Sequence, residues 1–212
     1  MRRGRKMTNN AMIEKASSLE ILNHWVLVAS FFTLAVSGYA FLFHLEQVGS
    51  VFGGFNQMKI VHNWAGVVFG VSLLLTTFSY LHVSLHFTSD DTTWFSKAGG
   101  YLSRAAVVPP QDELNAGQKL YYLVVLFTGM GIAASGFVIW LRPDVADIKK
   151  WILISHFVHN ICFDLMIIAI PAHIYLATLA NPGTFRIMVY GTVPLEWAKK
   201  RHAKWVQKIG AQ

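Results

Sequence analysis

Charged residues and cysteine are both scarce in this sequence. Asp, Glu, Lys and Arg make up 14% of the 212 residues, against about 25% in an ordinary soluble domain. A soluble helical domain of this size would have too few charges to cover its surface. The single cysteine, Cys162, excludes an intramolecular disulfide and any metal or iron–sulfur site that requires several cysteines.

Four long stretches of the chain are almost free of charge. A membrane span requires about 20 mostly apolar residues, and each stretch reaches that length. Because lipid offers the backbone no hydrogen bonds, each stretch is expected to be a helix. Among Asp, Glu, Lys and Arg, only Asp164 falls inside these stretches, which cover residues 21–45, 60–89, 120–141 and 151–185. The sequence therefore predicts an all-α integral membrane four-helix bundle, a single domain over residues 1–212 with spans at approximately 20–45, 60–88, 118–141 and 150–180.

The distribution of Lys and Arg predicts the orientation in the membrane. Four spans place both termini and the 90–119 connection on one side, and these segments hold 14 of the 18 Lys and Arg residues. The positive-inside rule therefore predicts that both termini are cytoplasmic. The first apolar stretch is too long for the apolar core of a signal peptide, so we interpret it as a retained helix.

The C-terminal segment Trp197–Trp205 carries much of this positive charge. Its pattern predicts a short amphipathic basic helix at a membrane surface. The net charge of +7 is therefore attributed to topology, and no nucleic acid is expected as a partner.

Histidines are numerous for a membrane protein, and ionisable groups inside a span are costly and usually functional. His24 lies near the cytoplasmic end of the first span, and His62 near the outer end of the second. In the fourth span, His173 lies 14 residues after His159, about 21 Å deeper and within roughly 40° of the same helix face. Depth therefore predicts two pairs, His62 with His159 and His24 with His173. Such pairs in a helix bundle ligate the iron of b-type haems, so two haem b groups are expected.

Other polar residues in the spans are weaker candidates. His156 is a poorer ligand because it lies about 100° around the helix from His173. His86 falls at the inner end of the second span and could lie near a haem propionate or a proton route. Asp164 points away from the face of the histidines, which favours a partner across a helix or subunit interface over a proton relay. Pro171 is expected to kink or loosen the fourth helix next to His173.

Several motifs resemble the cytochrome b (gamma) subunit of membrane-bound formate dehydrogenase, over nearly the whole chain. The segments Asn115–Lys119 (NAGQK) and Trp197–His202 (WAKKRH) are the most discriminating. The others are Leu22–Trp25 followed by Ser37 and Gly38, Lys59–His62, Trp140–Pro143 and His173–Tyr175.

This resemblance implies roles for individual residues. It implies that His62 and His159 bind one haem and that His24 and His173 bind the other. It also implies that Asn115, Gly117 and His173 line a site for menaquinone or ubiquinone. A helix N-terminus suits that task, because its unpaired N–H groups can bind a quinone carbonyl, and Asn115 is expected to cap the helix as well.

The resemblance further implies the partners and the location. The chain would transfer electrons in the bacterial inner membrane between an iron–sulfur (beta) subunit and a membrane quinone. Formate oxidation would belong to a molybdenum or tungsten catalytic (alpha) subunit, in an assembly that could be a trimer of heterotrimers. Two alternatives stay open: the same role beside a hydrogenase or a thiosulfate or tetrathionate reductase, and a haem-free membrane anchor or transporter.

Overall fold

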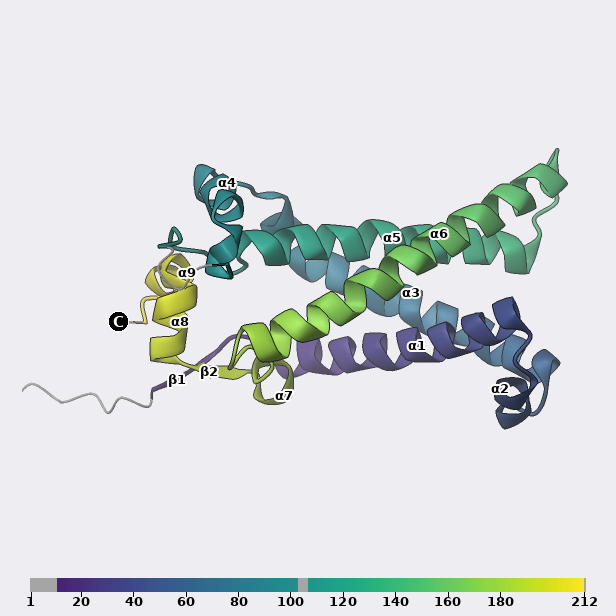
Figure 1. Ribbon diagram of the computed structural model, residues 1–212, viewed down its shortest axis with the longest axis horizontal. Helices are drawn as coiled ribbons and strands as arrows, with labels where there is room; N and C mark the ends of the chain where they lie inside the picture. Colours follow the sequence, from purple (N-terminus) through teal and green to yellow (C-terminus); the bar gives the residue numbers. More distant parts are fainter. Residues whose placement is uncertain (1–10, 103–106, 212) are drawn as a thin grey trace, which may run out of the picture. The chain divides into compact units, whose positions relative to one another are not determined.

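The computed structural model describes residues 11–102 and 107–211, so four of the basic residues counted near the N-terminus, together with Arg104, lie outside the described part. Four long helices dominate it (Figure 1). They are α1 (Ser18–Phe43), α3 (Phe55–Leu85), α5 (Ala116–Leu141) and α6 (Ile148–Tyr175). The described residues thus confirm the predicted all-α membrane architecture.

Each long helix has the length and composition of a membrane span. With 26 to 31 residues, each reaches about 39 Å or more, which exceeds the roughly 30 Å hydrocarbon core. Large apolar side chains such as Phe78 and Ile168 are 84% and 72% exposed, as expected for residues that face lipid. The helix ends fall within five residues of the predicted spans, the largest difference being α3, which begins at Phe55.

Helix α6 does not break at its proline. It remains helical through Pro171, and His173 still lies within it. A wider π-helical turn, η2 (Leu176–Ala180), follows and ends the span. The loosening that we expected next to His173 therefore lies after the histidine in the described structure.

The chain divides into two compact units, and three of the long helices build the core of one of them. That unit comprises Leu22–Tyr80 and Leu123–Ala172. Its core joins α1, α3 and α6 through Phe31, Phe69 and Met166, which are almost fully buried. The short helix α2 (Glu46–Val51) connects α1 to α3.

The other unit gathers both terminal segments and the connection between α3 and α5. It comprises the N-terminal segment to Ile21, Leu81–Tyr122 and His173 onwards. The strands β1 (Met12–Glu14) and β2 (Thr192–Pro194) pair antiparallel in it (Figure 1). Its remaining elements are α4 (Ser89–Ser96), η1 (Ala98–Gly100), α7 (Ile187–Tyr190), α8 (Leu195–Arg201) and α9 (Ala203–Lys208).

The predicted C-terminal helix is in fact two short helices. They are separated at His202, whose backbone leaves the helical region at φ −135°, ψ 49°. The apolar side chains Leu195, Trp205 and Val206 pack with Val193 of β2 in the core of this unit. The amphipathic pattern of the tail thus serves packing within the protein, while most of its lysines remain partly exposed or exposed.

Candidate functional site

Two of the predicted ligands face each other between helices of one unit. His62 of α3 and His159 of α6 have ring centroids 6.4 Å apart, with an angle of 54° between the ring planes. Metal–imidazole bonds of about 2 Å, extended from the ligating nitrogen to the ring centre, put two imidazoles on opposite sides of a metal about 6 Å apart. The observed separation fits ligation of one iron by both side chains.

Both imidazoles are oriented through Nδ1. His62 Nδ1 lies 2.7 Å from Ser37 Oγ, and that hydroxyl donates its own proton to the Thr33 carbonyl at 2.6 Å. His159 Nδ1 lies 3.1 Å from the Ile132 carbonyl and 3.1 Å from Ser135 Oγ. Each Nδ1 therefore carries a proton that it donates, which leaves the lone pair on Nε2 for a metal.

Two glycines lie beside these rings. A Cβ on Gly136 of α5 would lie 3.2 Å from Cε1 of His159, closer than an ordinary van der Waals contact. A Cβ on Gly38 of α1 would lie 3.8 Å from Cε1 of His62. A side chain at Gly136 would therefore crowd the His159 imidazole, whereas one at Gly38 would begin in ordinary contact with His62. Gly136 thus allows α5 to approach His159 closely.

The remaining two predicted ligands belong to different units. His24 lies in α1, and its Nδ1 is buried without a hydrogen-bond partner among the described residues. A buried polar atom normally has a partner, and no described residue supplies one to His24 Nδ1. His173 belongs to the other unit, where its ring stacks on Tyr121 of α5 at 4.5 Å and 10°.

The predicted quinone-binding segment forms the N-terminus of α5. Asn115 caps the helix as expected: its Oδ1 accepts from Gln118 N, and its own N donates to Gln118 Oε1, both at 2.9 Å. Gln111 Oε1 accepts from Ala116 N at 3.0 Å. The N–H of Gly117 has no acceptor among the described residues, so it is the amide in this turn that could bind a ligand oxygen.

Glycine is also the only residue type that fits at position 117 without a shift of its neighbours. A Cβ there would lie 2.7 Å from the indole of Trp94 in α4. Trp94 is 8% exposed and packs on the glycine directly. No local pattern in the sequence indicates this contact, because it joins two residues 23 positions apart.

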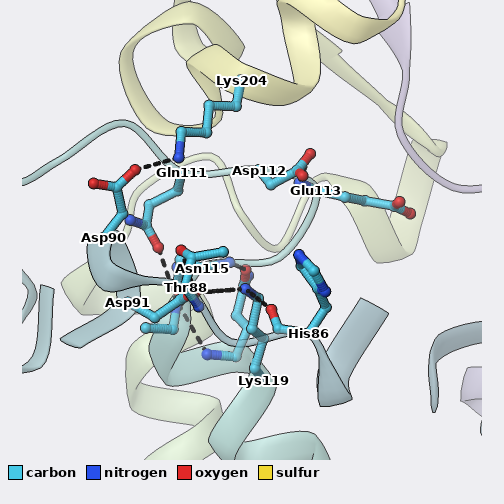
Figure 2. Close-up of polar contacts among 12 residues, drawn as sticks. His86, Thr88, Asp90, Asp91, Gln111, Asp112, Glu113, Asn115, Lys119 and Lys204 are labelled. Carbon is cyan, nitrogen blue, oxygen red and sulfur yellow. Dashed lines mark hydrogen bonds and ion pairs between the residues drawn. The ribbon is translucent and has the colours of Figure 1, made fainter. Parts of the chain in front are cut away.

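A buried ion pair that the sequence analysis missed fixes the same turn. Lys119 Nζ donates to Asp91 Oδ2 at 2.9 Å and to the His86 carbonyl at 2.8 Å (Figure 2). The two charged side chains are only 5% and 4% exposed. Burial alone would raise the pKa of the Asp91 carboxyl, but hydrogen bonds from Lys119 and Thr88 outweigh it and hold that pKa below its ordinary value.

One sequence signal for part of this arrangement exists. Thr88 and Asp91 have the spacing of a capping box, and Thr88 N and Oγ1 both donate to Asp91 Oδ2 at the start of α4. His86 contributes its backbone carbonyl to the ion pair. Asp164 and His156 lie on exposed positions of α6, where neither has a hydrogen-bond partner among the described residues.

These features define a class of protein. A helical membrane protein with two facing imidazoles, each oriented through Nδ1, has an arrangement that suits bis-histidine ligation of a haem iron. The chain belongs to the prokaryotic cytochrome b561 family, whose model matches residues 15–191. It is accordingly a bacterial membrane cytochrome b, and the family implies that its cofactor is haem b.

Named relatives indicate which kind of cytochrome b the chain resembles. The chain is 30% identical over 206 residues to the cytochrome b556(fdo) subunit of formate dehydrogenase from Escherichia coli K12, covering 96% of both chains. It is 27% identical over 207 residues to the nitrate-inducible b556(Fdn) subunit of the same strain, covering 96% of this chain and 94% of the relative. A formate dehydrogenase cytochrome b556 subunit from Haemophilus influenzae is 22% identical over 206 residues, covering 96% and 86%. The resemblance to these cytochrome b subunits is confirmed.

Proposed function

We propose that this chain is the electron-transfer subunit of a formate dehydrogenase complex, working as one di-haem domain. It passes electrons from a partner iron–sulfur subunit through two b haems to a membrane quinone. A separate molybdenum or tungsten subunit oxidises formate. The names of the relatives support this assignment of the complex, and the chain's cysteine content supports the division of labour, since one cysteine cannot hold an iron–sulfur cluster.

The facing pair His62 and His159 is the observation that carries the proposal. When bound there, haem supplies one-electron redox chemistry. The protein's own task is to hold the ligands: Ser37, Ser135 and the Ile132 carbonyl fix the two rings in the tautomer that exposes Nε2. We propose His24 and His173 as the second ligand pair.

The N-terminus of α5 is the proposed quinone site. The unpaired N–H of Gly117 is a donor for a quinone carbonyl, and the positive end of the helix dipole favours the negative charge that develops on reduction. Asn115 fixes this turn by capping it. Tyr121 lies less than two helical turns after Asn115 in α5, and His173 stacks on its ring. This contact supports the proposal that His173 lies beside the quinone site.

The proposed orientation has both termini in the cytoplasm. The structure supports their common side, because both terminal segments and the α3–α5 connection belong to one compact unit. The excess of Lys and Arg in these segments supports the cytoplasm as that side. Quinone reduced there would take its protons from the cytoplasm, while formate oxidation would occur on the periplasmic side.

A haem count on single variants tests the ligand assignment. The experiment is a reduced-minus-oxidised spectrum with haem quantification on the detergent-purified complex, for wild type, His159→Ala and His173→Ala. We expect two b haems per chain in the wild type and one in each variant, because each substitution removes a different iron ligand.

His156→Ala is the matched control, since His156 lies on the same helix and is expected to ligate nothing. It should retain both haems. A wild type without haem, or a stoichiometry unchanged by both ligand substitutions, would contradict the electron-transfer proposal and return the haem-free anchor or transporter to consideration.

A further inference from the structure

The C-terminal segment Leu195–Ala211 contacts the loop of residues 107–115, which leads into α5. His202 Nδ1 donates to the Asp112 carbonyl at 2.7 Å, and Lys204 N donates to the Gln111 carbonyl at 3.0 Å. Lys208 forms an ion pair with the Asp112 carboxylate. Two consecutive residues of the loop, Gln111 and Asp112, are thus held by contacts from α9 and from His202, which separates α8 from α9.

The side chain of His202, which donates to the Asp112 carbonyl, is a buried neutral imidazole. His202 is 2% exposed and packs beside Trp197. Burial, together with the nearby charges of Lys15 and Arg201, lowers the pKa of His202 to about 4. The side chain is therefore uncharged near neutral pH, and its Nδ1 proton is available to the Asp112 carbonyl.

The 107–115 loop leads directly into the proposed quinone site at the N-terminus of α5. Gln111, whose carbonyl Lys204 holds, is the residue whose side chain accepts from Ala116 N. Gln111 is 5% exposed, so this contact is shielded from water. A displacement of the loop would therefore remove an acceptor from the first amide of α5, next to Asn115 and Gly117.

The tail also reaches α4, which packs on Gly117 from the other side. Lys204 Nζ forms an ion pair with Asp90 (Figure 2). Asp90 precedes Asp91, the partner of Lys119, and Trp94 of the same helix covers Gly117. One residue of the tail thus contacts both segments that surround the start of α5.

Apart from these contacts, the loop is held mainly by single side chains. Lys97 Nζ donates to the Val107 carbonyl, and Gln118 Oε1 accepts from Asn115 N at 2.9 Å. Residues 107–115 form no helix or strand, and Pro109 and Pro110 lack backbone donors. Lys15 Nζ adds one contact from the N-terminal segment, to the Glu113 carbonyl at 2.6 Å. An irregular loop without its own hydrogen-bond ladder depends on neighbouring segments for a single conformation.

We propose that the C-terminal segment is a positioning element for quinone reduction, with His202 and Lys204 as its positioning residues. They fix the 107–115 loop and α4, and through them the Gly117 amide at the proposed quinone site. This inference rests on the function proposed above, and it adds a role for the tail that the ligand residues alone do not require.

The test uses paired variants in the complete complex. His202→Leu keeps the bulk of the side chain but loses its donor, whereas His202→Gln keeps an N–H donor. Lys204→Met removes the ion pair with Asp90. Lys199→Met is the control, because within the described part of the chain the ion pair of Lys199 is with Glu196 of its own helix, at 3.8 Å. Each variant is assayed for hydrogen–deuterium exchange in residues 107–118, haem content, and kcat and KM for quinone.

We expect His202→Leu to speed amide exchange in the loop about fivefold and to raise the quinone KM by a similar factor, the effect of about one lost hydrogen bond. Haem content and kcat should stay near wild type, because the substitution changes none of the four proposed haem ligands. His202→Gln should restore most of the KM. Lys204→Met should raise it by a smaller factor, and Lys199→Met should not.

The outcomes separate this proposal from the one on which it rests. A complex that reduces quinone but shows unchanged exchange and KM in His202→Leu contradicts the positioning role alone. Equal defects in the Leu and Gln variants contradict it as well, since imidazole packing would then explain them. If the His202→Leu variant loses haem, the Lys204→Met variant tests the positioning role instead. An unchanged quinone KM in that variant contradicts the role. A wild-type complex with both haems that does not reduce quinone overturns the proposed function together with this inference.

Discussion

Ser37 and Ser135 orient the two facing imidazoles from different helices. Each hydroxyl donates its proton back to its own helix, Ser37 to Thr33 and Ser135 to the Gly131 carbonyl, at 2.6 Å in both cases. Each oxygen is therefore an acceptor for a histidine Nδ1–H. The two serines differ in one respect. His159 has a second acceptor in the Ile132 carbonyl, whereas Ser37 is the one acceptor that the described residues offer to His62 Nδ1.

This difference predicts unequal effects of two small substitutions. Ser37→Ala should weaken haem binding at the His62 and His159 site by about 10-fold or more, because second-shell partners of metal-bound histidines contribute about that much. Ser135→Ala should have a smaller effect, since the Ile132 carbonyl still fixes His159. Haem retention during titration with a haem-binding competitor, and the midpoint potential of each haem, measure the difference.

The other haem is the internal control for this experiment. Its content and potential should not change in either variant. A larger effect of Ser135→Ala than of Ser37→Ala would contradict the assignment of Ser37 as the one acceptor that the described residues offer to His62 Nδ1.

The residues that sequence reasoning could and could not find differ in a physical way. The histidines could be sorted by depth because depth follows from position along a helix. In the structure the rings of His62 and His159 lie 6.4 Å apart, tilted by 54°. The serines could not be found, because their contact with histidine depends on how neighbouring helices are rotated, which spacing within one helix does not specify.

At the scale of elements, the junction of α4 and α5 depends on the buried pair of Asp91 and Lys119. Lys119→Met should leave the Asp91 carboxylate buried without its cation. Breaking a buried pair in this way costs about 3–5 kcal/mol. We expect α4 to open far more often, and hydrogen–deuterium exchange of residues 88–96 to rise by about 100-fold or more.

The double variant Lys119→Met with Asp91→Asn is the matched control. It removes the uncompensated charge, so exchange should return toward the wild-type rate. Lowering the pH should have a related effect. Because the pKa of Asp91 is held below its ordinary value of 3.8, its contribution to stability is fully present above that value and lost as pH falls below it. Equal exchange in the single and double variants would contradict this account.

Elements were predictable where the pattern was long and uniform. Uncharged runs predicted the four long helices to within five residues at their ends. The tail was predicted as one helix because its amphipathic spacing is continuous, yet the structure breaks it at His202. That break follows from a tertiary contact: the imidazole turns inward to donate to the Asp112 carbonyl, 90 positions earlier in the chain.

At the scale of the whole molecule, composition was sufficient for the fold class, but the division into two units was not predictable. One unit joins three segments that are far apart in the sequence: the N-terminal segment, Leu81–Tyr122 and the chain from His173 onwards. Some of their contacts are apolar, such as the packing of Ala16 with Val193 and Trp205, and others are ion pairs, such as that of Lys204 with Asp90. Hydropathy carries no information about such pairings, although it predicts that all three segments lie on one side of the membrane.

This grouping leads to a topology prediction that can be tested in cells. Moving Lys and Arg across a membrane is opposed, and the side that holds the termini carries 14 of these residues against 4 on the other. A fluorescent protein that folds only in the cytoplasm should therefore be active when fused after Gln212. Alkaline phosphatase, which requires the periplasm, should be inactive there and active when inserted near Asp144, in the loop between α5 and α6. The opposite pattern would place the N-terminus of α5 in the periplasm, and quinone reduction at that site could no longer draw its protons from the cytoplasm.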